Sequence, residues 1–110
     1  MDESEREKLR KQIERDLKKQ MKLNSTTARY HADMVTDYLA LWDLKNELFD
    51  DIRDTGIQVM GMHGPKSNPS IADLHKTNDR MIRILDALNL NVPKIEVPKS
   101  ISAASKSDLV

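Results

Sequence analysis

The chain of 110 residues contains no cysteine, and glycine, proline and aromatic residues are scarce. The absence of cysteine excludes disulfides, thiolate metal sites and cysteine nucleophiles, and it fits a cytoplasmic protein. One tryptophan, two tyrosines and one phenylalanine provide little bulky packing for a sheet-rich core. Hydrophobic residues make up 38% of the chain and charged residues 33%, a balance that suits amphipathic helices. We therefore expect a single all-α domain with a modest core.

Long apolar runs are also missing. No stretch approaches the roughly 18 consecutive apolar residues that a membrane span requires. The first residues are charged, where a secretory signal peptide would have an apolar core. We therefore expect a protein that is neither exported nor inserted into a membrane, and that has no membrane partner.

The sequence patterns of common enzyme and metal sites are absent too. There is no phosphate-binding glycine loop, no serine nucleophile motif and no Cys/His pairing. His31, His63 and His75 do not share the spacing of a helical metal site. Adjacent carboxylates such as Asp50 and Asp51 would point about 100° apart on a helix. We therefore expect no catalytic residue, no metal site and no cofactor, and a protein that is not an enzyme.

Charge is balanced overall, with 18 Lys and Arg against 18 Asp and Glu, but it is unevenly distributed. Between residues 8 and 22, two anions (Glu14 and Asp16) face seven cations, namely Lys8, Arg10, Lys11, Arg15, Lys18, Lys19 and Lys22. Between residues 29 and 54 the sign reverses, and the anions are Asp33, Asp37, Asp43, Glu47, Asp50, Asp51 and Asp54. The basic segment can bind nucleic-acid phosphates, or it can lie on the acidic segment and neutralise it. The residues alone leave both interpretations open, and the two can coexist.

Hydrophobic periodicity predicts three helices. The first covers residues 4–22 and has one apolar stripe, formed by Leu9, Ile13, Leu17 and Met21. The second follows residues 24–27 and ends at residues 55–56. After a short extended segment and a loop, the third begins at residue 70, with an apolar face formed by Ile71, Leu74, Met81, Ile82, Leu85 and Leu88. The second and third helices should form a long antiparallel hairpin.

Capping residues mark the expected helix ends. Ser4 with Glu7, and Ser70 with Asp73, have the spacing of a capping box. The segment 24–27 is rich in residues that cap helix N-termini. A glycine at position 56 is typical of the residue just beyond a helix C-terminus.

The long second helix has two apolar stripes and therefore needs two partners. One stripe comprises Val35, Tyr38, Trp42, Phe49 and Ile52, and the other comprises Met34, Leu41, Leu44 and Leu48. A helix of this length is roughly 40 Å long, whereas a compact domain of about 100 residues has a radius of gyration near 13 Å. We therefore expect the helix to overhang a single copy and to bury its surplus apolar surface against neighbouring copies.

From about residue 30 to about residue 95 the chain resembles the small subunit of phage terminases, in the P27-like family. The order and spacing of several short motifs carry the resemblance. Their residues are Tyr38, Leu39, Trp42, Leu48, Asp54, Thr55, Gly56, Ile57, Asn68, Pro69, Ser70, Leu74, Asn78, Met81, Leu85, Leu88, Asn89, Leu90 and Pro93. Family members usually end the last helix with glycine, where this chain has Asn89, and asparagine tolerates the same left-handed cap.

The resemblance implies a protein that forms a ring-like homo-oligomer in the cytoplasm of the bacterial host. Such a subunit binds double-stranded viral DNA and delivers it to the large terminase subunit, which holds the ATPase and nuclease, for packaging into the capsid. The missing catalytic motifs, the surplus apolar surface and the uneven charge agree with this function. The alternative is a non-enzymatic oligomeric adaptor that binds other proteins but not DNA.

The sequence thus predicts a basic N-terminal helix (1–24), an oligomerising helical hairpin (25–90) and a flexible C-terminal tail (91–110). For DNA contact we predict Lys8, Arg10, Lys11, Arg15, Lys18, Lys19, Lys22 and Arg29. For the oligomer interface we predict Val35, Tyr38, Trp42, Phe49, Leu74, Met81 and Leu85. The tail would dock on the large subunit through Ile95, Val97 and Ile101. The opposite charge blocks also suggest that first-helix cations of one copy meet second-helix anions of its neighbour.

Overall fold

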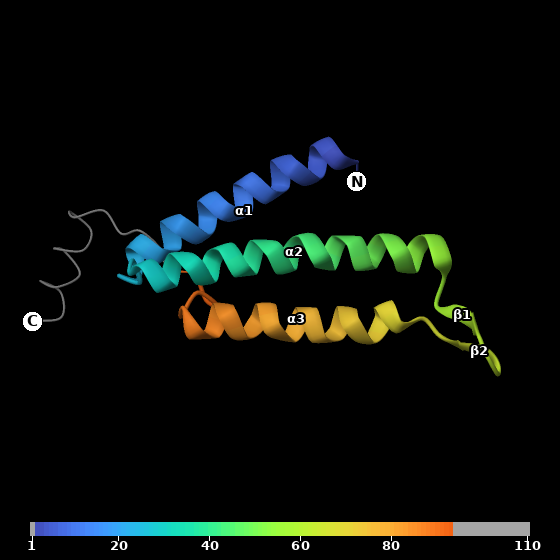
Figure 1. Cartoon of the computed structure of the whole chain (residues 1–110). Coiled ribbons are helices and arrows are strands. Elements are labelled where there is room, and N and C mark those ends of the chain that lie inside the picture. Colours follow the sequence, from blue (N-terminus) through green and yellow to red (C-terminus); the bar gives the residue numbers. More distant parts are fainter. Residues whose placement is uncertain (1, 94–110) are drawn as a thin grey trace, which may run out of the picture.

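The computed structural model describes residues 2–93, which form three α-helices and one β-hairpin (Figure 1). In chain order the elements are α1 (Glu3–Leu23), α2 (Arg29–Thr55), β1 (Gln58–Gly61), β2 (Gly64–Ser67) and α3 (Pro69–Ala87). The helices contain 73% of these residues, which confirms that the fold is mostly helical. The small two-stranded sheet was not predicted.

The N-terminal cap of α1 is Asp2, whose carboxylate accepts a hydrogen bond from the Glu5 N–H (2.7 Å). The predicted capping box at Ser4 is therefore wrong, because Ser4 already lies inside the helix. A carboxylate at the cap satisfies a backbone donor and also interacts favourably with the positive end of the helix dipole. At the other end of α1, Ser25 adopts a left-handed conformation (φ 59°) and turns the chain toward α2.

The start of α2 departs from the capping pattern, whereas its end follows it. The helix begins behind Ala28, whose N–H donates to Nδ1 of His31 (3.3 Å). The candidate cap Asn24 instead donates from Nδ2 to the Leu88 carbonyl (2.8 Å), so it connects the C-terminal ends of α1 and α3. As predicted, α2 ends at Gly56, which has a φ of 95° that favours glycine.

Between α2 and α3 the chain forms a β-hairpin, where the sequence predicts an extended segment followed by a loop. The two strands pair antiparallel, with Val59 opposite Lys66 and Gly61 opposite Gly64. The prediction missed β2 because its sequence, Gly-Pro-Lys-Ser, has no alternation of apolar and polar residues. The hairpin extends beyond the ends of α2 and α3 (Figure 1), and its side chains Met60 and Met62 are exposed.

Asn68 connects the end of α2 to the start of α3. Its Oδ1 accepts from the Ser70 N–H (3.0 Å), and its Nδ2 donates to the Gly56 carbonyl (2.9 Å) and to Asp51 Oδ2 (3.1 Å). The predicted cap Ser70 is therefore wrong, because Ser70 lies in the first turn and its hydroxyl donates to Asp51 (2.6 Å). Only 3% of Asn68 is exposed, so its hydrogen bonds replace bonds to water at a buried position.

Asn89 ends the last helix in the way that the sequence predicts. It has a left-handed conformation (φ 56°), and its N–H donates to the Asp86 carbonyl (3.0 Å). The next residue, Leu90, donates to the Leu85 carbonyl (2.8 Å). This pair of bonds is the Schellman arrangement that satisfies the last carbonyl groups of a helix.

The helices form an elongated layer in which α2 lies between α1 and α3 (Figure 1). The helices α2 and α3 run antiparallel, which confirms the predicted hairpin, and α1 runs back along the other side of α2. The core gathers at the end where α1 and α3 finish, and its buried apolar residues are Met21, Val35, Leu39, Leu88 and Leu90. With a radius of gyration of 19.6 Å and extents of 71 × 28 × 28 Å, the molecule is much longer than a compact domain of this size.

Candidate nucleic-acid interface

The helix α1 presents an apolar face to α2, and this face fixes the direction of every other side chain on the helix. Met21 is buried in the core, and Ile13 and Leu17 pack against it from the same side. Toward the N-terminus the packing thins, so that Leu9 is 37% exposed. In Figure 1 α1 leans away from α2 toward this end.

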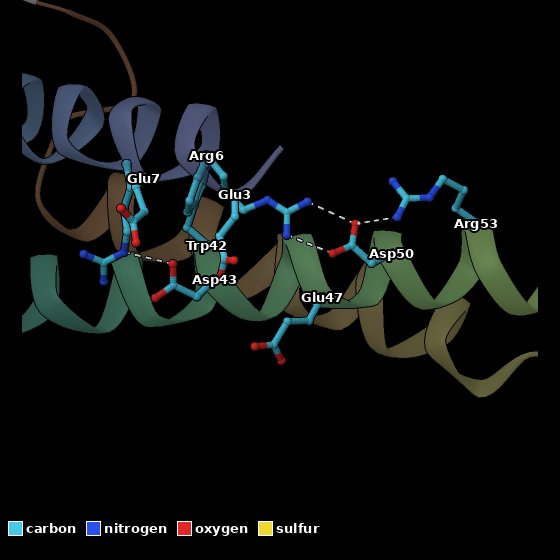
Figure 2. Close-up of a pocket in the computed structure, with 9 residues that line it drawn as sticks. Glu3, Arg6, Glu7, Trp42, Asp43, Glu47, Asp50 and Arg53 are labelled. Carbon is cyan, nitrogen blue, oxygen red and sulfur yellow. Dashed lines mark hydrogen bonds and ion pairs between the residues drawn. The ribbon is translucent and has the colours of Figure 1, made fainter. Parts of the chain in front are cut away.

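Two arginines hold the N-terminal half of α1 to α2. Arg6 makes a two-pronged ion pair with Asp50, with Nη1–Oδ2 and Nη2–Oδ1 distances of 2.8 and 3.0 Å. Arg10 donates from Nε to Oδ1 of Asp43 (2.9 Å). Figure 2 shows Arg6 reaching from α1 to Asp50 on α2, and both ion pairs drawn across the seam. We call these two ion pairs the arginine clasp.

The arginine clasp borders an open pocket of about 630 Å³ between α1 and α2. The indole of Trp42 contributes apolar lining, and the rest is charged: Glu3, Arg6, Glu7, Arg10, Asp43, Glu47, Asp50 and Arg53. The hydrogen bonds from Arg6 lower the pKa of the Asp50 carboxyl, and Arg53 on the same helix lowers it further. The same ion pair raises the pKa of Arg6, so the Arg6–Asp50 pair is charged at neutral pH.

Five cations form an unbroken stripe on the side of α1 that faces away from α2. They follow one another at intervals of three and four residues, so they lie on one face of the helix: Lys8, Lys11, Arg15, Lys18 and Lys22. All five are exposed. At 1.5 Å per residue, the stripe is about 21 Å long. We call these five residues the basic stripe.

The basic stripe has little internal neutralisation. Lys18 pairs with Glu14 one turn earlier (2.9 Å), and this bond lowers the pKa of the Glu14 carboxyl. The Lys18 side chain nevertheless stays 64% exposed, and such surface pairs contribute little to stability. Within residues 2–93, the other four members of the stripe make no ion pair.

The eight predicted DNA contacts therefore separate into different positions. Five form the basic stripe, and Lys19 is exposed beside it. Arg29 is exposed at the first residue of α2. Arg10, in contrast, points toward α2 and is engaged by Asp43, so we remove it from the predicted DNA contacts. One cation of the basic segment, Arg10, thus neutralises an anion of α2. The other cations of the segment are exposed, so DNA contact stays a prediction for them.

Arg6, which joins α1 to α2 by a two-pronged ion pair, was not among the predicted site residues. Its partner was already assigned to the acidic segment, but Arg6 itself lies before the basic segment at 8–22. The spacing held a usable signal: Arg6 and Arg10 are four residues apart, and Asp43 and Asp50 are seven apart on the second helix. Both intervals place their residues on one helix face, as an antiparallel seam requires.

The predicted oligomer interface requires a correction. Val35, Trp42 and Met81 are buried within this single chain, and Tyr38, Leu74 and Leu85 are partly buried. Burial also raises the pKa of the Tyr38 hydroxyl. Only Phe49, with 50% exposed, keeps much of its surface open. The buried residues are already covered within one chain, so they have no surplus surface to share.

Other predictions concern sites outside this interface. Within residues 2–93, no group of three or more His, Cys, Asp and Glu side chains is arranged to hold a metal ion. No helix in the same range is both long enough and apolar enough to cross a bilayer. The predicted docking residues Ile95, Val97 and Ile101 lie outside the described residues.

A comparison with known proteins finds no family model, no curated protein and no solved structure that matches this chain. The argument for function therefore depends on the residues and on their geometry.

Proposed function

We propose that this protein is a non-enzymatic DNA-binding subunit that acts as the small subunit of a phage terminase. In this role it binds double-stranded viral DNA in the host cytoplasm and delivers it to the large subunit for packaging. The basic stripe is the observation that supports DNA binding, because it exposes five cations along one face of α1. Delivery to a large subunit rests on the resemblance of residues 30–95 described above.

The dimensions of the basic stripe suit the backbone of duplex DNA. Duplex DNA carries one phosphate charge per roughly 1.7 Å of its axis, so about 12 charges lie along a 21 Å stripe. Lysine and arginine side chains that neutralise phosphates release condensed counterions, and this release drives binding without regard to base sequence. A long helix packed through its opposite face on α2 can present these cations without any rearrangement of the fold.

Charge reversal within the basic stripe tests this proposal. Lys11→Glu/Lys18→Glu should weaken binding to a duplex of about 20 base pairs by at least tenfold, measured by fluorescence anisotropy at about 50 mM salt. Lys66→Glu/Met60→Glu/Met62→Glu is the matched control, because it makes the same change of net charge at exposed side chains of the β-hairpin, outside α1. Circular dichroism verifies that both variants keep their helices.

Two results would contradict DNA binding by the stripe. One is an equal loss of affinity in the β-hairpin control, which would indicate a response to net charge alone. The other is no binding by the unmodified chain at about 50 mM salt, where phosphate contacts are strong. The second result would favour the adaptor that binds proteins only, in which the stripe meets an acidic protein surface.

A further inference from the structure

The side of the α2–α3 pair that bears Leu41 and Ile84 keeps apolar surface open. Leu44 on α2 is 41% exposed, and Ala40 beside it is also exposed. Between the two helices lies a groove of about 470 Å³, and Leu41 and Ile84 form its floor. This apolar surface belongs to the second stripe of α2, which α3 covers only in part. We call this side of the molecule the α2–α3 face.

Opposite charges border the groove. On α2 the border holds Asp33 and Asp37, one helical turn apart. On α3 it holds Lys76, Arg80 and Arg83, whose spacing of four and three residues places them on one helix side. Asp37, Arg80 and Arg83 line the groove itself. Among the described residues, none of these five charged side chains forms an ion pair with another.

The register of the α2–α3 pair places Asp37 and Arg83 at nearly the same height along the helices. Lys45 donates to Asn78 Oδ1 (3.4 Å), and Ser70 donates to Asp51 Oδ2 (2.6 Å), so antiparallel positions are fixed at two points. From either point, equal numbers of residues counted along α2 toward its start and along α3 toward its end bring Asp37 level with the turn that contains Arg83. Asp37 and Ile84 line the same groove, which agrees with this register.

We propose that the α2–α3 face binds the same face of a second copy, around a two-fold axis parallel to the helices. Rotation about this axis leaves the position of every residue along the helices unchanged, and it places α2 of one copy opposite α3 of the other. Asp37 of each copy then meets Arg80 and Arg83 of the other, and Leu44 of each copy is covered by the opposite α3. Four helices that alternate in direction around an apolar centre form a four-helix bundle.

Charge selects a second copy as the occupant. One face carries both an acidic border and a basic border. When a second copy is rotated by the two-fold axis, its basic border meets the acidic border of the first copy and the reverse, as an interface between identical surfaces requires. A purely basic or purely acidic partner would meet one border of like charge, which costs affinity. The inference deepens the proposed function and rests on its assembly part alone, because the basic stripe on α1 takes no part in this interface.

The arrangement also has a consequence for a ring. When two copies bind through identical faces, both faces are used up and no third copy can bind there. Pairs of chains would therefore be the building units, and a larger ring would join these pairs through a different surface.

Reversing the charge of each border in turn tests the inference. Pairing is measured by analytical ultracentrifugation of the full chain, without DNA, from about 1 μM to about 1 mM. The unmodified chain should form pairs. Arg80→Glu/Arg83→Glu and Asp33→Lys/Asp37→Lys should each weaken pairing at least tenfold, since like charges then face each other. An equal mixture of the two variants should restore pairing, because each border again meets its opposite. Leu44→Glu provides a second variant, in which a charge lies in the apolar centre.

The control is Lys11→Glu/Lys18→Glu, which alters the basic stripe and should pair as the unmodified chain does. All altered side chains are exposed, and circular dichroism verifies folding. A chain that stays monomeric over the whole range overturns the inference, and so does pairing that is insensitive to the border variants. Neither result affects DNA binding by the basic stripe, which anisotropy measures separately.

Discussion

At the scale of single residues, the structure depends on a few polar side chains that each serve two elements. Asn68 caps α3 and also donates a hydrogen bond to the carbonyl of Gly56, the residue that follows α2. The Asp51 carboxylate accepts hydrogen bonds from both Asn68 and Ser70. Asn24 and Asn89 play the same part at the opposite end, where they are hydrogen-bonded to each other (3.2 Å). These residues tie the elements together at both ends of the helical layer, and at the Asn24 end they do so beside the apolar core.

The buried cap at Asn68 should therefore contribute strongly to stability. Asn68→Ala removes the cap and leaves the Gly56 carbonyl and the Ser70 N–H without their partner. We expect a loss of about 1–3 kcal/mol in the free energy of unfolding, measured by urea denaturation. Asn91→Ala, at an exposed position outside the helices, should change it by less than about 0.5 kcal/mol. Equal effects of the two substitutions would contradict the role assigned to Asn68.

At the scale of elements, periodicity was sufficient to predict the three helices, since Leu9, Ile13, Leu17 and Met21 repeat as one helix face requires. Predicting the N-terminal caps of α1 and α3 failed because a second capping residue stands two positions before Ser4 and before Ser70, and that residue, Asp2 or Asn68, makes the cap bond. The strand β2 has no periodic signal. The interface prediction failed at Val35, Trp42 and Met81 for a related reason, because the sequence could not reveal that these residues are buried within one chain.

The arginine clasp predicts how the docking of α1 responds to acid. Because Arg6 lowers the pKa of Asp50 in the folded chain, the clasp stabilises docking at any pH above the ordinary carboxyl value of about 3.9. This contribution is lost as the pH falls through the lowered pKa. In a carboxyl NMR titration, Asp50 should titrate below about 3.9, and in Arg6→Gln its midpoint should move up.

Asp51 provides the internal control for this titration. Its pKa is lowered by hydrogen bonds from Ser70, Asn68 and Thr55, and none of these involves α1. Its midpoint should therefore stay low in Arg6→Gln. If the midpoint of Asp50 were unchanged in that variant, the ion pair would not be the cause of the shift, and α1 would be held by its apolar face alone.

At the scale of the whole molecule, the chain is a slender rod, and we propose a separate function for each of two sides. The outward side of α1 carries the basic stripe, and the α2–α3 face carries apolar surface between opposite charges. Because α2 lies between α1 and α3, copies can associate through the second side while the first stays open to DNA. The two sides are separate because the clasp arginines of α1 point toward α2, whereas the cations of the basic stripe point away from it.

The salt dependence of DNA binding tests the central claim most directly. Five phosphate contacts per copy predict that the logarithm of the association constant falls with the logarithm of salt concentration, with a slope near −4.5 for each copy bound. Neutralising two members of the stripe, in Lys11→Gln/Lys18→Gln, should reduce the steepness of this slope by about 2. A slope close to zero for the unmodified chain, or one that the substitutions leave unchanged, would show that the basic stripe does not contact DNA phosphates.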